Sequence, residues 1–192
     1  MHKTIEVLME EHRLIERVLG SLEAHVAAVR AGEPLVRDAI GEFAGFFSGF
    51  TDAQHHAKEE DILFRRMAEQ GFPVGTGPLA VMLHEHDLGR AHVKALAEFG
   101  SGGGAPDPLE QRRILEHADI YAPFLRQHIM KEERVLYPLA LDLLKERELD
   151  AMNAEFESKD ARSREDGSYD ALRGLADRLA ARYPAPDCCA MR

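Results

Sequence analysis

Two copies of one short pattern contain most of the residues that could do chemistry. The stretch HHAKEEDILF begins at His55, and HIMKEERVLY begins at His128, 73 residues later. In each copy a histidine is followed four residues on by a glutamate, His55 by Glu59 and His128 by Glu132. Residues i and i+4 of a helix project from one face. Each copy therefore presents an imidazole and a carboxylate together, which is a ligand pair that suits iron or manganese.

A second pair of similar stretches strengthens the metal interpretation. Glu11 and His12 in the first half correspond to Glu85 and His86 in the second half, at nearly the same separation. The chain therefore consists of two similar halves, each with one histidine followed later by a His-x-x-x-Glu pattern. Four histidines and two glutamates that face a common interior predict a two-metal site. The predicted metal ligands are His12, His55, Glu59, His86, His128 and Glu132.

Adjacent histidines leave a choice of register in the first copy. His56 and Glu60 have the same spacing as His55 and Glu59. Aligning the later LF of the first copy with the LY of the second places His55 on His128, and His56 opposite an isoleucine. We therefore predict that His55 and Glu59 are ligands and that His56 and Glu60 either support them or lie at the surface.

The remaining histidines show no repeated pattern. His84 is turned about 200° from His86 on a helix and is predicted to face outward. Tyr121 lies seven residues before His128, so it either hydrogen-bonds a metal ligand or belongs to the core. Four further histidines are predicted to lie at the surface, namely His2, His25, His92 and His117.

Apolar residues recur at helical spacing in four long segments. These segments are about 4–30, 35–70, 79–99 and 109–146. Gly41, Gly45 and Gly49 recur every fourth residue in the second segment and predict close approach of a neighbouring helix. Pro123 is predicted to bend or break the fourth segment. Four such helices with short links predict an up-down-up-down four-helix bundle.

The end of the chain has a different pattern. Residues 147–168 are mainly polar, and a short amphipathic helix with apolar residues from Tyr169 to Tyr183 follows. We predict an all-α fold, with a metal-binding bundle at 1–146 and a C-terminal extension at 147–192 that contains one additional helix and a tail. Cys188 and Cys189 are adjacent in that tail, which excludes a disulfide framework.

Charge and hydropathy exclude some functional classes. The net charge of −10 argues against nucleic acid and anionic membranes as partners. No stretch approaches the roughly 20 apolar residues of a membrane span. The first residues are amphipathic and show no apolar signal region, so the sequence predicts a cytoplasmic protein. It does not predict any protein partner.

Four stretches of the sequence resemble the hemerythrin-like, or HHE cation-binding, family. They are EEHRLIERVL, HHAKEEDILF, HEHDLGR and HIMKEERVLYP, and the resemblance extends over about 5–144. It implies a four-helix bundle of hemerythrin type that holds a non-haem di-iron centre. It also implies ligand roles for the six residues named above, with Glu59 and Glu132 bridging the metals.

The sequence departs from the oxygen-carrying hemerythrins in two places. Those proteins have His-x-x-x-His on the third helix, whereas Arg90 follows His86 by four residues here. Their last bridging acid is an aspartate at i+5, whereas Glu132 lies at i+4. The set is more similar to that of the bacterial iron–sulfur-cluster repair proteins and the iron-sensing hemerythrin-like domains. Those repair proteins usually carry an N-terminal cysteine domain, which is not seen in this sequence.

Counting ligands gives the expected chemistry. One metal would take His12 and His55, the other His86 and His128, and both would share the two carboxylates and an oxo or hydroxo bridge. Iron prefers about six ligands, so one position on each metal stays open for a diatomic ligand or peroxide. The first hypothesis is a protein that binds or senses dioxygen, nitric oxide or iron. The second is an oxidoreductase acting on nitric oxide or peroxide, or an iron–sulfur-cluster repair protein. A structural metal cross-link is the third.

Overall fold

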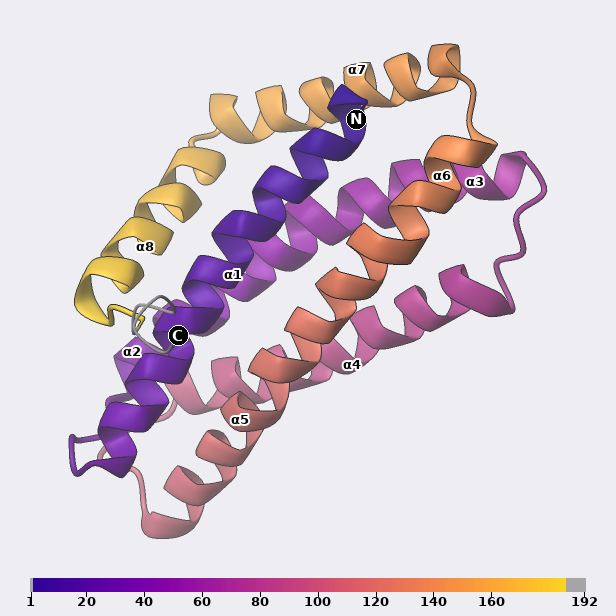
Figure 1. Ribbon diagram of the computed structural model, residues 1–192. Helices are drawn as coiled ribbons and strands as arrows, with labels where there is room; N and C mark the ends of the chain where they lie inside the picture. Colours follow the sequence, from indigo (N-terminus) through magenta and orange to yellow (C-terminus); the bar gives the residue numbers. More distant parts are fainter. Residues whose placement is uncertain (1, 186–192) are drawn as a thin grey trace, which may run out of the picture.

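The computed structural model describes residues 2–185, and within that range every regular element is helical. Eight α-helices and three π-helical segments follow one another along the chain (Figure 1). They are α1 (Lys3–Arg30), α2 (Arg37–Phe46), η1 (Phe47–His56), η2 (Glu59–Phe64), α3 (Arg65–Glu69), α4 (Gly77–Gly100), α5 (Pro108–Lys131), η3 (Glu132–Leu136), α6 (Tyr137–Leu143), α7 (Glu146–Glu165) and α8 (Ser168–Arg182).

Four long helical rods form the main body, as the periodicity predicts. The first is α1, and the second runs without interruption from α2 through η1 and η2 to α3. The third is α4, and the fourth runs from α5 through η3 to α6. In π-helical segments the hydrogen bonds span five residues rather than four, and such segments are frequent at functional sites. Here they occur only on the two rods that contain the His-x-x-x-Glu patterns, among the described residues.

The fourth rod does not break at Pro123, so a break at this proline is excluded, whereas a bend stays a prediction. Helix α5 starts at a capping box, in which Asp107 and Glu110 satisfy each other's backbone amides, and it continues through Pro123 to Lys131. A proline inside a helix costs about 3 kcal/mol because it removes a hydrogen bond and crowds the preceding turn. Buried neighbours on both sides of it, Tyr121, Ala122 and Leu125, offset that cost.

Two apolar clusters fill the interior, with a polar layer between them. One cluster contains Leu14 on α1 and Phe50 on η1, and the other contains Leu8 on α1 and Ile62 on η2. The turn between Leu8 and Leu14 carries His12, and the residues between Phe50 and Ile62 carry the first His-x-x-x-Glu pattern. The rods therefore hold a buried polar layer near mid-length, and the apolar clusters above and below fix it in place.

Close approach of helices explains two of the three repeated glycines. A Cβ atom on Gly41 would lie 3.5 Å from the Cα of Gly100 on α4, and one on Gly49 would lie 2.7 Å from the side chain of Leu172 on α8. A Cβ atom on Gly45 would meet nothing within 4 Å, so the prediction of close approach is wrong there.

Gly100→Ala is expected to lower the free energy of unfolding by about 1–3 kcal/mol. Its Cβ atom would lie 2.5 Å from the Cα and 2.7 Å from the nitrogen of Gly41, and this backbone cannot move aside without separating α2 from α4. Gly45→Ala is the matched control and should raise the free energy of unfolding by up to about 1 kcal/mol, because alanine favours a helix over glycine. Urea titrations measure both, and equal stability of the two variants would contradict the close approach.

The C-terminal extension contains two helices instead of the one predicted. Helix α7 occupies the stretch predicted to be merely polar, and it buries Leu149, Met152 and Phe156 against the cluster that contains Leu8. Both α7 and α8 pack along α1 (Figure 1). The division of the chain at residue 146 stays a prediction, and Cys188 and Cys189 lie outside the described residues.

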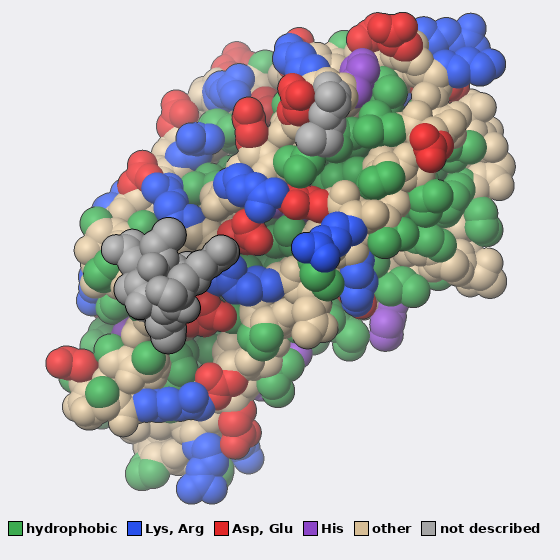
Figure 2. Space-filling model, viewed as in Figure 1, with side chains coloured by type: hydrophobic (Ala, Val, Ile, Leu, Met, Phe, Trp, Pro, Cys, Tyr) green, Lys and Arg blue, Asp and Glu red, His purple; other side chains and the backbone are tan. Residues whose placement is uncertain are grey.

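The surface over α1, α7 and α8 carries acidic and basic side chains side by side (Figure 2). Ion pairs connect these helices, such as Lys3 with Glu157 and Arg17 with Asp177. Within residues 2–185, none of the helices has both the length and the apolar character needed to cross a bilayer.

Candidate metal centre

The six residues predicted as ligands meet in the polar layer. His12 lies on α1, His55 near the end of η1 and Glu59 at the start of η2. His86 lies on α4, His128 in the last turn of α5, and Glu132 at the start of η3. All six are at most 1% exposed. They include both copies of the His-x-x-x-Glu pattern and both preceding histidines, so residues from four separate rods converge in one place.

The converging side chains form two overlapping groups with the spacing of metal ligands. In each group, one ligand atom from every residue lies within 4.8 Å of the others. The first group is His12, His55, Glu59 and Glu132, and the second is His56, Glu59, His86 and His128. Glu59 belongs to both groups, as a bridging carboxylate would. The chain thus contains two neighbouring four-residue groups that share one carboxylate.

His56 is the residue that the sequence assigned differently. It was predicted to support the ligands or to lie at the surface, yet it is only 5% exposed and belongs to the second group. Its ring stacks on that of His86, with 3.8 Å between centroids and an interplanar angle of 12°. The π-helical backbone of η1 explains this placement, because a wider turn brings consecutive residues closer to one face. His55 and His56 therefore both face the interior.

A carboxylate holds the outer nitrogen of each of the four predicted histidine ligands. Since these carboxylates accept a hydrogen bond from Nδ1–H, the lone pair of each Nε2 is left to point inward. The Nδ1···O distances are 3.0 Å for His12 to Glu133, 3.0 Å for His55 to Glu11, 2.6 Å for His86 to Glu60 and 2.9 Å for His128 to Glu85.

Each of these outer carboxylates also meets a cation. Glu11 pairs with Lys58, and Glu85 pairs with Lys131 in the second half. The other two pairs are Glu133 with Arg13, and Glu60 with Arg90. The sequence repeat therefore specifies more than ligands. The glutamate before each single histidine, and the lysine and second glutamate of each HxxKEE stretch, hold the histidines in orientation. A supporting role was one of the two predicted for Glu60, and the other roles were missed. The recurring Glu-His and Lys-Glu-Glu spacing was the signal for them.

The centre of the site contains hydrogen-bond acceptors that face one another. His86 Nε2 and His128 Nε2 lie 3.0 Å apart. Oε1 of Glu132 lies 2.9 Å from His128 Nε2, and its Oε2 lies 3.2 Å from His12 Nε2. Neither oxygen of Glu132 has a hydrogen-bond partner, and neither does Oε2 of Glu59. Buried acceptors without donors are costly, and cations between them would remove that cost. The residues present therefore fit two metal ions.

Burial and mutual charge set the protonation of these groups. Burial raises the pKa of Glu59 well above its usual range, and the charge of Glu132 raises it further. Burial also opposes ionisation of Glu132, but His128 and His12 outweigh it and hold that pKa well below the usual range. Burial alone would lower the pKa of His128, yet the carboxylates of Glu132 and Glu85 raise it to about 9. Protons thus compete with metal ions for this centre.

Comparison with known proteins agrees with this geometry. A family model described as the hemerythrin HHE cation binding domain matches residues 3–140, which contain all the residues of both groups. The chain belongs to the hemerythrin HHE family. Its C-terminal helices α7 and α8 lie beyond the matched range.

Relatives of this hemerythrin-family chain are distant. Uncharacterized proteins of Mycobacterium tuberculosis and Mycobacterium bovis are 22% identical over 157 residues, which are 82% of this chain and 61% of those proteins. An iron–sulfur cluster repair protein, YtfE of Pectobacterium atrosepticum, is 31% identical over 91 residues, 46% of this chain and 41% of its own length. The chain thus spans about three-fifths of the mycobacterial relatives and less than half of YtfE. No solved structure gives a significant match.

The two halves of the hemerythrin-type site differ in one aromatic position. Phe64 stacks on His86 in the second group, with 5.9 Å between ring centroids. Tyr137 occupies the corresponding position beside His12 at 5.6 Å. Its hydroxyl donates to Oε1 of Glu59 at 2.7 Å and lies 3.2 Å from His12 Nε2. Only the first group therefore has a phenol at its edge, and only the second has a third histidine.

Other predicted positions gave mixed outcomes. His84 is exposed, as predicted. His25 was predicted to lie at the surface but is only 4% exposed, against the rings of Phe43 and Tyr183. Tyr121 packs against Phe47, with ring centroids 5.0 Å apart, and belongs to neither metal group.

Proposed function

We propose that this chain is a non-haem di-iron protein that binds or senses dioxygen, nitric oxide or iron. The observation that carries the proposal is the set of inward-facing Nε2 atoms and partnerless carboxylate oxygens at the centre of the bundle. Neutral imidazole with carboxylate suits iron and also manganese. The proposal includes the up-down-up-down topology of hemerythrin-type bundles.

The side chains divide the work of holding two metals. His12 and His55 would bind one ion, while His86, His128 and His56, which lies in the same group, would bind the other. Glu59 and Glu132 would bridge them. Iron bound there would supply reversible attachment of small ligands and exchange of single electrons. The outer carboxylates hold the imidazoles in the required tautomer, and the apolar clusters on both sides keep bulk water away.

A second candidate function is a di-iron oxidoreductase that acts on nitric oxide or peroxide, or in iron–sulfur-cluster repair. Two observations favour it. One relative is named as an iron–sulfur cluster repair protein. The hydroxyl of Tyr137 donates to Glu59 and lies beside His12, so it could deliver a proton at the edge of the first group. Burial raises the pKa of Tyr137 well above its usual range, which keeps that proton on the phenol.

Metal analysis tests the proposal directly. Protein produced with added iron is expected to contain about two iron ions per chain, since the two groups each supply four residues. Two manganese ions per chain would support the two-metal site but would show that its metal is manganese and not iron. A purified protein with only trace transition metal, although folded by circular dichroism, would overturn the assignment.

Absorption spectra of the reduced protein, before and after air or nitric oxide, distinguish the two candidate functions. A change that reverses when the gas is removed supports binding or sensing. A permanent change to the oxidised spectrum, with consumption of the added gas or peroxide over many turnovers, supports the oxidoreductase.

His56→Ala is expected to lower the metal content to about one ion per chain, with the loss confined to the second group. The variant leaves only two imidazoles and a shared carboxylate there. His55→Ala should cause a similar loss from the first group. Metal analysis of both proteins, with His84→Ala as the exposed control, checks this expectation. Full occupancy in His56→Ala together with loss in His55→Ala would restore the original register, in which His56 only supports the site.

A further inference from the structure

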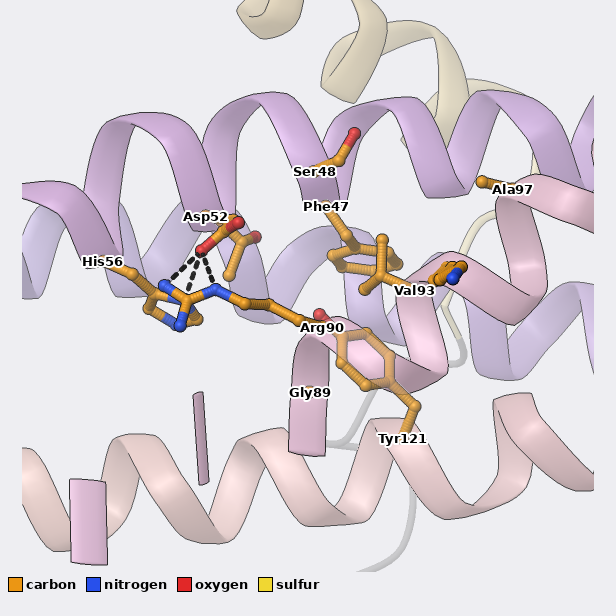
Figure 3. Close-up of a pocket in the computed structure, with 11 residues that line it drawn as sticks. Phe47, Ser48, Asp52, His56, Gly89, Arg90, Val93, Ala97 and Tyr121 are labelled. Carbon is orange, nitrogen blue, oxygen red and sulfur yellow. Dashed lines mark hydrogen bonds and ion pairs between the residues drawn. The ribbon is translucent and has the colours of Figure 1, made fainter. Parts of the chain in front are cut away.

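A cavity outside the two metal groups opens between η1 and α4 (Figure 3). Its volume is about 170 Å³. An apolar protein cavity of about 150 Å³ accommodates one benzene ring, so this cavity can hold a molecule of that size. Exposed Ser48, Lys94 and Ala97 lie at its outer end, and buried Thr51 and Tyr121 lie deeper. It therefore connects the surface with the interior.

Apolar and aromatic groups form most of the wall. Phe47 faces Tyr121 edge to face, with 5.0 Å between ring centroids, and Val93 completes this side. The absence of a side chain on Gly89 leaves room beside Tyr121. Figure 3 shows the ring of Tyr121 below Phe47 and Val93, with its hydroxyl on the side of Arg90. Stacked and edge-on contacts with two aromatic rings favour a planar ring as the occupant.

Two polar atoms of the residues in this wall have no hydrogen-bond partner, Nδ1 of His56 and the hydroxyl oxygen of Thr51. Thr51 is 1% exposed, and its hydroxyl oxygen makes no hydrogen bond. A buried hydroxyl without a partner is unfavourable. A bound molecule with a hydroxyl group of its own would satisfy it.

The charges at the end of the cavity beside His56 disfavour an anion. Arg90 crosses this end and is bound to Asp52 at 2.8 Å, to Glu60 at 2.7 Å and to Asp87 at 3.0 Å. Three carboxylates thus surround one guanidinium, and it has no free charge to offer. Lys94 at the outer end is exposed and in water. Because the carboxylates here outnumber the guanidinium, a neutral ligand fits the cavity better than a carboxylate or phosphate.

We propose that this cavity binds a small neutral molecule the size of one aromatic ring that carries a hydroxyl group, with phenol as the simplest example. His56 also lines the cavity, and its ring stacks on His86 of the second metal group. The imidazole of His56 would therefore lie between a molecule bound there and His86. The proposal does not depend on which metal the site holds.

Calorimetric titration of the protein as purified, with phenol, toluene and benzoate, tests the proposal. The expected order of affinity is phenol first, toluene second and benzoate last. Thr51→Val keeps the shape of the wall and removes its hydroxyl. It should weaken phenol binding by about fivefold, the factor that corresponds to one neutral hydrogen bond, and leave toluene binding unchanged.

Ala97→Trp places a bulky side chain at the exposed outer end and should weaken phenol and toluene by at least about tenfold. Ala91→Trp, an exposed position on the same helix that does not line the cavity, is the matched control and should bind both as the wild type does. Phenol binding that is absent, or that persists unchanged in Ala97→Trp, would overturn the proposal, because the ligand would then bind elsewhere, such as on the metal. Equal affinity for phenol and benzoate would overturn the neutral class of ligand.

Discussion

Glu132→Gln is expected to remove nearly all bound metal, from about two ions per chain to less than about half an ion. This carboxylate lies between the two groups, since Oε1 is 2.9 Å from His128 Nε2 and Oε2 is 3.2 Å from His12 Nε2. Glutamine has the same shape but cannot bridge two cations with negative oxygens, and its amide hydrogens would face the inward nitrogens. One substitution should therefore affect both metals.

Glu133→Gln is the graded comparison for that result. Glu133 is the next residue, and His12 is the one predicted ligand that it touches, through the outer nitrogen at 3.0 Å. Loss of such an outer contact typically lowers metal affinity by 10–100-fold, so this variant should weaken one ion and retain the other. Metal content and circular dichroism of both variants are the measurements. Retention of two ions in Glu132→Gln, or equal loss in both variants, would contradict the bridging position.

The sequence predicted the meeting of the six residues because two regularities fixed it. Helical periodicity places His12 on the apolar face of its segment, and the internal repeat assigns His86 the same position in the second half. Each His-x-x-x-Glu pattern then needs only helical backbone to face inward. These are local properties, so they could be predicted before any packing was known. The ligand roles themselves stay predictions until metal is measured.

Other features depend on contacts that a single segment does not reveal. His56 faces inward because η1 is π-helical, and the hydrogen-bond register of a helix is not evident from its residue types. Helix α7 was missed because charged residues separate Leu149, Met152 and Phe156. Their spacing of three and four residues was nevertheless the helical signal. Asp160 on the same helix becomes important only through its contact with Lys58, which is distant in the sequence.

Lys58→Met is expected to lower the free energy of unfolding by about 3–5 kcal/mol. The side chain of Lys58 is fully buried and pairs with Glu11, and with Asp160 on α7 at 2.6 Å. Burial alone would lower the pKa of this ammonium, but Glu11 and Asp160 raise it, so the lysine stays charged. Methionine would fill the space but leave a buried carboxylate without its cation, which is the costly way to break a buried ion pair.

The second half of the chain supplies the matched control. Lys131 is the counterpart of Lys58 and pairs with Glu85, but its side chain is 40% exposed. Water can solvate Glu85 after Lys131→Met, so the expected loss is at most about 1 kcal/mol. Urea titration of the metal-free proteins measures both values without interference from ligand binding. Two chemically identical substitutions at equivalent positions should thus differ severalfold in their effect.

A double substitution separates charge from packing. If the cost of Lys58→Met comes from the unpaired carboxylates, then adding Glu11→Gln should recover part of it, because one of the two negative charges beside the methionine is removed and only that of Asp160 remains. If packing were the cause, the second substitution would add a further loss.

The same lysine also orients His55 through Glu11, so metal affinity at the first group should fall by about 10–100-fold in Lys58→Met. Equal stability losses for Lys58→Met and Lys131→Met would show that burial does not distinguish the two ion pairs.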